Sequence, residues 1–315
     1  MSNNSTMATY CSFEEVDRLM TSLELVIYIP IFLMGLVLNT LALVVFCVLL
    51  RKWTESTIYM TNLALMDLLL LLLLPFKMHA TNNQWSAKHR LLCSFLESMY
   101  FVGMYGSIYT IVCIAVDRWV AIKHPFRAKQ LRSPQAALGT CVLVWFLTLG
   151  GISPIYGFRQ AGDEDFNCFH GFSEKGWTPA VVGCLEVFGF LGPALVLVGC
   201  SAQSVKTLKN SGQESTKRQA CERIIYSSLC AFLLPFTPSH LAILLQFLVR
   251  HGVIKDCRTQ TKISLFLQVS MSLANITCCL DAFCYYFIAH EVRSSKHTYR
   301  ARTFSQRKTI SSSDV

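Results

Sequence analysis

Apolar residues along this chain are gathered into seven long blocks rather than spaced along one face of amphipathic helices. The blocks cover residues 23–50, 57–79, 91–117, 137–157, 178–205, 221–249 and 260–288. Each is close to or longer than the roughly 20 residues that an α-helix needs to cross a bilayer. The pattern predicts an all-α membrane protein: a seven-transmembrane helix bundle over residues 23–290, with tails at 1–22 and 291–315.

The charged residues fix an expected orientation for this bundle. Only 15% of the 315 residues are charged, against about 25% in soluble domains. Most of the 28 Lys and Arg residues fall on the side that holds Arg118 and the C-terminal tail. This excess predicts a cytoplasmic C-terminus and an external N-terminus in a multi-pass protein of the plasma membrane.

The external tail carries glycosylation signals, and the net charge has a simple origin. Asn3 and Asn4 each begin an Asn-x-Ser/Thr sequence, so we expect this to be a glycoprotein. The net charge of +9 reflects the inner basic excess. Because basic–aromatic repeats and a folded basic domain are lacking, the sequence indicates no binding to nucleic acid.

Four of the 14 cysteines lie in segments predicted to be external, namely Cys11, Cys93, Cys168 and Cys257. An even number of cysteines in an oxidising compartment predicts two disulfide bonds, for which three pairings are open. One pairing joins Cys93 to Cys168 and Cys11 to Cys257. It would tie the second outer loop to the third span and the N-terminal tail to the last outer loop.

A set of short motifs recurs through the spans in a fixed order. They are Gly35 and Asn39; Asn62-Leu63-Ala64-Leu65-Met66-Asp67; Cys93 and Asp117-Arg118-Trp119; Trp145 and Pro154; Pro193; Phe236-Thr237-Pro238; and Asp281-Ala282-Phe283-Cys284-Tyr285. In this order and at these separations they resemble the class A (rhodopsin-like) G-protein-coupled receptors over essentially the whole chain. Leu-Pro-Phe-Lys in span two and Cys-Cys-Leu-Asp in span seven resemble the lysophosphatidylinositol-receptor branch of that family.

This resemblance implies a receptor that transduces a signal to heterotrimeric G proteins of the twelve/thirteen or q class. Asp117 lies next to Arg118 and can hold its guanidinium at rest, the alternative being an ordinary arginine at the membrane interface. The resemblance implies that Arg118 contacts the Gα subunit when span six swings outward. The switch residues would be Phe236, Pro238 and Tyr285. Span seven has Asp281-Ala282 where most relatives have Asn-Pro, and Phe236 stands where many have Trp, so the details of the switch should differ.

Two carboxylates lie deep within apolar spans, where acidic residues usually face the bundle interior or a hydrated cavity. They are Asp67 and Asp281. With Ser107, the resemblance implies an oxygen-lined site for a sodium ion. The alternative is a protonated acid hydrogen-bonded to its neighbours, because two carboxylates in a low dielectric favour protonation of one. No other cofactor is expected.

Polar and aromatic residues in the outer half of the bundle are the candidate ligand contacts. They are Lys77, Glu97, Tyr100, Met104, Glu186, Phe190, His170, His240, Gln246 and Asn275. Lys77 near the top of span two needs a partner, which is either Glu97 or an anionic ligand. A cationic rim above an apolar cavity suits an acidic amphiphile, a nucleotide or a small carboxylic acid; the resemblance favours lysophosphatidylinositol.

The C-terminal tail and the competing classes of protein complete the expectations. Serine and threonine residues among basic residues in the tail predict phosphorylation and arrestin binding, and Ser313-Asp314-Val315 fits a PDZ ligand. A transporter or channel is the distant alternative, but the two halves show no self-similarity. No catalytic cluster appears, so the sequence does not predict an enzyme.

Overall fold

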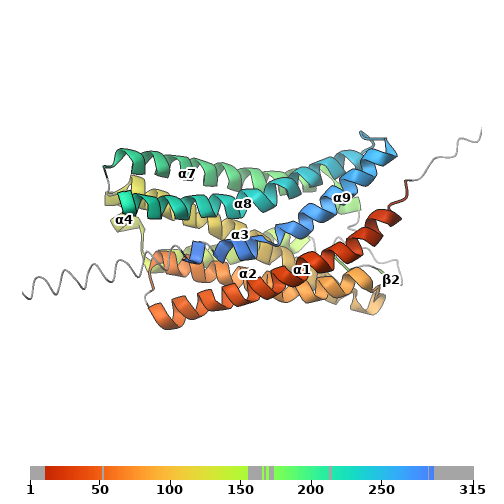
Figure 1. Ribbon diagram of the computed structural model, residues 1–315, viewed down its shortest axis with the longest axis horizontal. Helices are drawn as coiled ribbons and strands as arrows, with labels where there is room; N and C mark the ends of the chain where they lie inside the picture. Colours follow the sequence, from red (N-terminus) through yellow and green to blue (C-terminus); the bar gives the residue numbers. More distant parts are fainter. Residues whose placement is uncertain are drawn as a thin grey trace, which may run out of the picture.

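A computed structural model describes residues 11–51, 53–154, 165–166, 168–169, 174–212, 215–282 and 284–286. Seven long helices run along one axis of the molecule (Figure 1). They are long and apolar enough to cross a membrane, and their bounds are Glu14–Leu50, Glu55–Asn82, Ala87–Lys123, Pro134–Ile152, Pro179–Asn210, Arg218–Arg250 and Cys257–Tyr286. The seven predicted spans are confirmed. The first helix begins at Glu14, ahead of residue 23 where the apolar block starts.

The spans are built from several helical segments and one small sheet. The elements are α1 (Glu14–Leu43), η1 (Val44–Leu50), α2 (Glu55–Asn82), β1 (Trp85–Ser86), η2 (Ala87–His89), α3 (Arg90–Lys123), α4 (Pro125–Leu131), α5 (Pro134–Ile152), β2 (Asp165–Phe166), η4 (Glu174–Trp177), α6 (Pro179–Glu186), η5 (Val187–Leu191), α7 (Gly192–Asn210), α8 (Ser215–Arg250) and α9 (Cys257–Ala274). The fifth span is α6, η5 and α7 in succession, and η5 is a π-helical turn between two α-helices.

Three of the helices begin at side chains that satisfy otherwise unpaired backbone N–H groups. Thr54 and Thr57 form a reciprocal capping box at α2. Ser133 accepts a hydrogen bond from the Ala136 N–H at α5, and Asp256 accepts one from the Thr259 N–H at α9. These caps set where each helix starts after a connecting loop.

Helix α3 lies in the middle of the bundle, among α2, α5, α7 and α8 (Figure 1). Gly103 lets α2 and α3 approach closely, because a Cβ there would lie 3.1 Å from the Leu70 nitrogen and the Met66 carbonyl oxygen. Leu63, Leu70 and Leu74 of α2 are buried in this interface. The central position of α3 brings its polar side chains next to most other spans.

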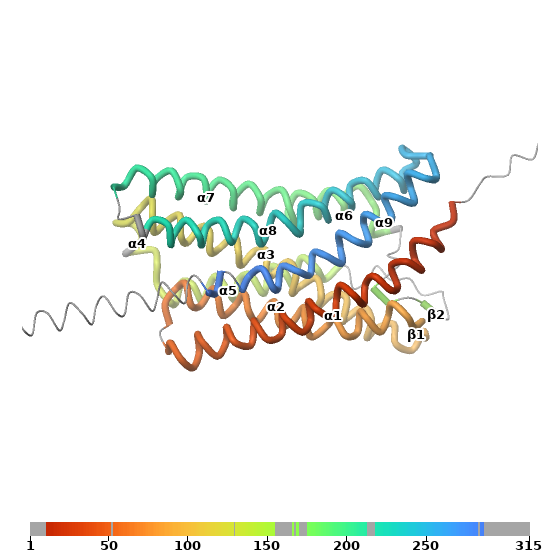
Figure 2. The backbone as a smooth tube through the Cα atoms, in the orientation of Figure 1, coloured from red at the N-terminus to blue at the C-terminus, as the bar shows by residue number. Residues whose placement is uncertain are grey.

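The two ends of the bundle carry different connections, as the backbone trace shows (Figure 2). Strands β1 and β2 pair antiparallel at one end, with Trp85 opposite Phe166. This ladder was not predicted from the apolar pattern. Helix α4 lies at the opposite end. We call the end with β1 and β2 the outer end and the end with α4 the inner end, after the orientation predicted from the basic residues.

Candidate functional site

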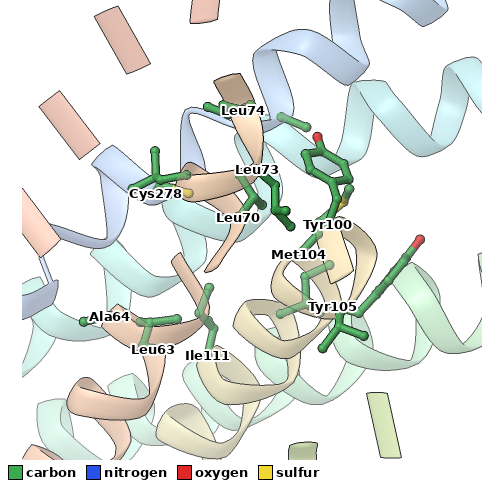
Figure 3. Packing of buried hydrophobic residues seen from close by; sticks show 14 of the residues in the cluster. Leu63, Ala64, Leu70, Leu73, Leu74, Tyr100, Met104, Tyr105, Ile111 and Cys278 are labelled. Atoms are coloured by element: carbon green, nitrogen blue, oxygen red, sulfur yellow. The ribbon is translucent and has the colours of Figure 1, made fainter. Parts of the chain in front are cut away.

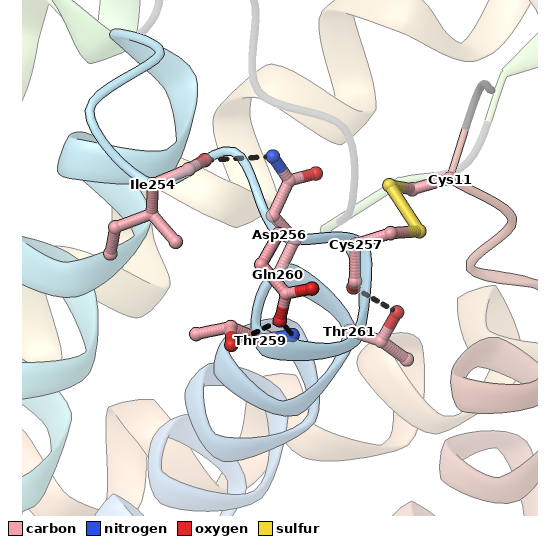
Figure 4. The surroundings of a disulfide bond; sticks show 7 residues. All are labelled: Cys11, Ile254, Asp256, Cys257, Thr259, Gln260 and Thr261. Atoms are coloured by element: carbon pink, nitrogen blue, oxygen red, sulfur yellow. Dashed lines mark hydrogen bonds between the residues drawn. A yellow bond between two sulfur atoms is a disulfide. The ribbon is translucent and has the colours of Figure 1, made fainter.

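Two disulfides hold the outer end together. Cys93 at the start of α3 is bonded to Cys168 of the loop that follows β2, with the Cα atoms 5.8 Å apart. Cys11 is bonded to Cys257 at the start of α9, with the Cα atoms 5.4 Å apart (Figure 4). The two predicted disulfides are confirmed. Of the three possible pairings, the structure has the one that ties the second outer loop to span three and the N-terminal tail to the last outer loop.

Lys77 lies inside the bundle, with only 7% of its surface exposed. Its Nζ donates a hydrogen bond of 3.4 Å to the Tyr100 hydroxyl. The ammonium also lies 4.6 Å from the centre of the Tyr100 ring and 5.2 Å from that of Tyr28. Aromatic faces attract a cation electrostatically, so two rings and a hydroxyl stabilise the buried ammonium.

The same two tyrosines connect the lysine to α9. The Tyr28 hydroxyl is 2.9 Å from the Ser272 hydroxyl, and the Tyr100 hydroxyl donates a 2.8 Å hydrogen bond to the Asn275 Oδ1. Helices α1, α2, α3 and α9 therefore each contribute to the surroundings of Lys77. Of the predicted ligand contacts, the structure brings Lys77, Tyr100 and Asn275 together.

Glu97 has a backbone partner at the disulfide-bonded loop. Its Oε1 accepts a 2.7 Å hydrogen bond from the Phe169 N–H, one residue after Cys168. The Phe169 ring packs edge-on against Tyr100 at 5.9 Å. Glu97 was one of two predicted partners of Lys77, the other being an anionic ligand. This hydrogen bond holds the loop against α3, one helical turn from Tyr100. Met104 lies buried one further turn along α3 (Figure 3).

A second group of predicted contacts lies between the fifth and sixth spans. His240 Nδ1 is 3.3 Å from Glu186 Oε1, and both side chains are largely buried. The Phe190 ring stacks on His240 at 4.8 Å and on Phe232 at 5.8 Å. Phe190 belongs to the π-helical turn η5, and such turns often occur at functional sites. Gln246 lies further along α8, toward the outer end.

The mid-bundle acids are both fully buried. Asp67 accepts hydrogen bonds from the Ser107 hydroxyl at 2.8 Å and the Tyr285 hydroxyl at 3.0 Å. Asp281 interacts electrostatically with Asp67, and its oxygens have no other hydrogen-bond donor among the described residues. Carboxylate and hydroxyl oxygens suit a hard cation such as sodium. The same arrangement also fits a proton shared by the two acids, so both predicted interpretations stand.

The inner end shows a different ion pair from the one expected. Both Asp117 oxygens accept hydrogen bonds from Arg132, at 2.7 and 2.9 Å, while Arg118 donates to the Ser56 hydroxyl at 3.1 Å. Consecutive residues on a helix point in different directions, which explains why the acid meets Arg132 beyond α4 instead of its neighbour. Glu55 lies 3.7 Å from the same guanidinium.

Arg118 faces a small cavity between α3, α7 and α8. Its lining is Ile114, Ala115, Arg118, Ser201, Ile224, Ile225 and Ser228. Higher in the bundle, Phe236 is buried against Phe232 with ring centres 5.5 Å apart, and Pro238 lies within α8 one residue before the buried Ser239. Tyr285 also donates to Asn39 Oδ1 at 2.9 Å, which links span seven to α1.

Some predicted residues lie outside the described part of the chain: His170, Asn3, Asn4, the tail serines and threonines, and Val315. Others were missed. Tyr28, Glu24 and Ser272 belong to the Lys77 site, and Arg132 to the inner pair. Glu24 carried a usable signal, because an acid within an apolar span usually faces the bundle interior.

Comparison with known proteins gives a consistent result. The model of the 7 transmembrane receptor (rhodopsin family) matches residues 38–285. The chain is 42% identical to G-protein coupled receptor 55 of Homo sapiens over 297 residues, 92% of each chain. It is 34% identical to human G-protein coupled receptor 35 over 83% of this chain and 82% of the relative. Mouse lysophosphatidic acid receptor 4 is 31% identical over 93% of this chain and 80% of the relative.

Proposed function

Because this chain belongs to the rhodopsin family of seven-transmembrane receptors, we propose that it binds an anionic lysophospholipid at its outer end. Lysophosphatidylinositol is the ligand we favour. Binding would activate heterotrimeric G proteins of the twelve/thirteen or q class at the inner end. The chain is a receptor and not an enzyme, and it is a multi-pass protein of the plasma membrane.

The observation that supports this ligand class is the buried Lys77. A charged group held among apolar helices is costly unless another charge or several hydrogen bonds compensate it. Among the described residues, the Lys77 Nζ directly contacts two aromatic faces and one hydroxyl, which stabilise a cation less than a directly bonded anion does. A phosphate would complete the site through charge-assisted hydrogen bonds.

The surroundings of Lys77 also suit the rest of an amphiphile. Tyr100, Met104 and Tyr105 lie along the buried face of α3 (Figure 3) and offer an apolar surface for an acyl chain. The name of one relative, lysophosphatidic acid receptor 4, describes a receptor for a lipid of this chemical class. In the Glu186–His240 pair, the carboxylate would accept hydrogen bonds from headgroup hydroxyls and the imidazole N–H would donate to them.

The test is an agonist screen with lysophosphatidylinositol, a nucleotide and an aromatic carboxylic acid on wild type, Lys77→Ala and Lys88→Ala. Lys88 is exposed on η2, so its variant removes the same charge from the outer end without touching the site. Losing a charge-assisted contact of about 1.5–3 kcal/mol should raise the EC50 of the lipid roughly 10- to 100-fold in Lys77→Ala alone. A full response of Lys77→Ala would remove the lysine from the proposal. If only the nucleotide or only the carboxylic acid activated the receptor, that compound class would replace the lipid as the proposed ligand.

Signalling at the inner end has its own test. We expect Arg118 to contact Gα beside the small cavity that it lines with Ser201 and Ser228. Ligand-dependent GTP exchange on added Gα subunits should vanish in Arg118→Ala, while lipid binding is retained. A panel of purified Gα proteins then decides between the twelve/thirteen and q classes.

Further expectations belong to the same proposal. The N-terminal tail would lie outside the cell with glycans on Asn3 and Asn4, and the C-terminal tail would bind arrestin after phosphorylation and a PDZ domain at Val315. Asp67, Ser107 and Asp281 would hold sodium. Each is open to a direct measurement, such as a glycosidase shift or a sodium titration of agonist affinity.

A further inference from the structure

A buried acid lies across the α1–α2 interface from the proposed headgroup site. Glu24 and Tyr28 are one turn apart on the buried stripe of α1, and Lys77 and Thr81 are one turn apart on α2. The Thr81 hydroxyl donates a 2.7 Å hydrogen bond to Glu24 Oε2. Tyr28 in turn lies under the Lys77 ammonium, at 5.2 Å. The two pairs thus face each other, with the acid one turn nearer the outer end than the ring.

Glu24 cannot be read as an ordinary surface acid. Only 3% of its surface is exposed, and an ionised carboxylate is rarely buried without an opposite charge. The Thr81 hydroxyl that bonds Glu24 also lies 3.1 Å from the Lys77 carbonyl oxygen, and the ring of Tyr28, one turn from Glu24, contacts the Lys77 ammonium. Across this interface the described residues therefore place one acid and one base, held by Thr81 and two tyrosine rings.

We propose that Glu24 is the resident counter-ion of Lys77, and that an anionic headgroup binds by taking its place. This inference rests on the proposed function, because it concerns the same lysine and the same ligand class. In the ligand-free receptor Glu24 compensates the buried ammonium. When a phosphate arrives, its oxygens bond the Lys77 ammonium directly and replace Glu24 as the compensating charge, while Glu24 keeps its hydrogen bond from Thr81.

This arrangement would make Glu24 a determinant of specificity. A headgroup must compete with a carboxylate that is already present and that repels other anions. Phosphate headgroups can do so through several charge-assisted hydrogen bonds. A neutral monoacylglycerol has no charge to offer and should bind poorly. Selectivity through a repulsive element is a common device in recognition.

The experiment compares Glu24→Gln with Glu15→Gln in full-length receptor in lipid nanodiscs. Glu15 is exposed on the same helix, so its variant makes the same charge change away from the site. The amide of Gln still accepts from Thr81. We expect Glu24→Gln to tighten binding of lysophosphatidylinositol about tenfold, because a competing like charge is removed, with the affinity for a neutral monoacylglycerol unchanged. Glu15→Gln should match wild type.

Two outcomes would overturn the inference. Unchanged lipid affinity in Glu24→Gln would mean that the acid does not compete, and weaker affinity would mean that it positions Lys77 for the ligand. If Glu24→Gln fails to fold, Glu24→Ala removes the same charge and carries the same expectation. Lys77→Ala separates the two proposals: unaltered lipid binding there removes the lysine from the proposed function, whereas weakened binding there together with unaltered binding in Glu24→Gln contradicts only the counter-ion.

Discussion

The outer and inner ends of this receptor each hold a basic side chain at least partly inside the bundle, and they do so in opposite ways. At the outer end Lys77 is 7% exposed and contacts two rings and a hydroxyl 3.4 Å away. At the inner end the Arg132 side chain is 25% exposed and donates two short hydrogen bonds to Asp117. The first charge is buried and loosely held, whereas the second is near water and tightly held.

The contrast has an electrostatic basis. Burial by itself would lower the pKa of Arg132, but its hydrogen bonds to Asp117 and the charges of Asp117 and Glu55 raise that pKa overall. The inner pair is therefore complete by itself. At the outer end the low dielectric around Lys77 would make its attraction to an anion stronger than in water.

The largest expected effect comes from removing the hydroxyl that connects the outer site. Tyr100→Phe takes one acceptor from Lys77 and one donor from Asn275, leaving two buried polar groups with fewer partners. We expect a loss of about 2–6 kcal/mol in stability, since each of the two groups costs about 1–3 kcal/mol. The thermal midpoint of purified receptor measures it.

Salt should leave the Tyr100→Phe effect unaltered, because buried charges are poorly screened. Tyr226→Phe is the control, since Tyr226 is 49% exposed on α8. A thermal midpoint of Tyr100→Phe equal to that of wild type would show that the hydroxyl does not support the site.

The second effect concerns the inner pair and should be smaller. Arg132→Ala removes both hydrogen bonds to Asp117, whose side chain is 8% exposed. A partly exposed pair is screened, so we expect a loss of about 1–2 kcal/mol. This loss should become smaller as salt rises from about 0.1 to 1 M, whereas the loss in Tyr100→Phe at the outer site should not change.

A double-mutant cycle isolates the inner pair. Asp117→Asn and Arg132→Ala should be strongly non-additive, because each removes the same two hydrogen bonds. Arg127→Ala is the matched control, an exposed arginine on α4. Additive effects of the two changes would mean that the pair contributes nothing as a unit.

Features that depend on the composition and order of residues could be predicted from the sequence. Apolar blocks predicted all seven spans because a bilayer demands about 20 apolar residues in succession. Charges inside such blocks stand out, so Lys77, Asp67 and Asp281 could be picked out at once. Cysteines outside the spans predicted that two disulfides form, although three pairings were open, and the structure shows which of them holds the loop beside Glu97.

Partners were harder to predict than sites. Which face of each helix meets which neighbour depends on helix rotation, and an apolar block without amphipathic spacing does not fix it. The sequence therefore could not choose Tyr28 and Glu24 as neighbours of Lys77, on a helix far along the chain. Asp117 was assigned to Arg118 by adjacency, yet only residues three or four apart share a helix face, and its partner lies after α4.

The smallest expected effect comes from a charge that is fully exposed to solvent. Asp256 is an exposed N-cap of α9 beside the Cys11–Cys257 disulfide (Figure 4). Hydrogen bonds from the Thr259 hydroxyl and N–H hold the pKa of Asp256 below its usual range. A lowered carboxyl pKa stabilises the folded state above the ordinary value of about 3.9, and that stabilisation is lost as pH falls through the lowered value.

Thermal midpoints measured from neutral pH down into this acid range would separate the cap from the charge. Asp256→Asn should keep the cap and match wild type near neutrality, because Asn caps helices about as well as Asp, yet it should lack the acid-dependent loss. Asp256→Ala should be less stable at every pH, though less so than Arg132→Ala at low salt, since the exposed Asp256 is the most fully solvated of these charges. Identical acid profiles for wild type and Asp256→Asn would assign the acid loss to other carboxylates.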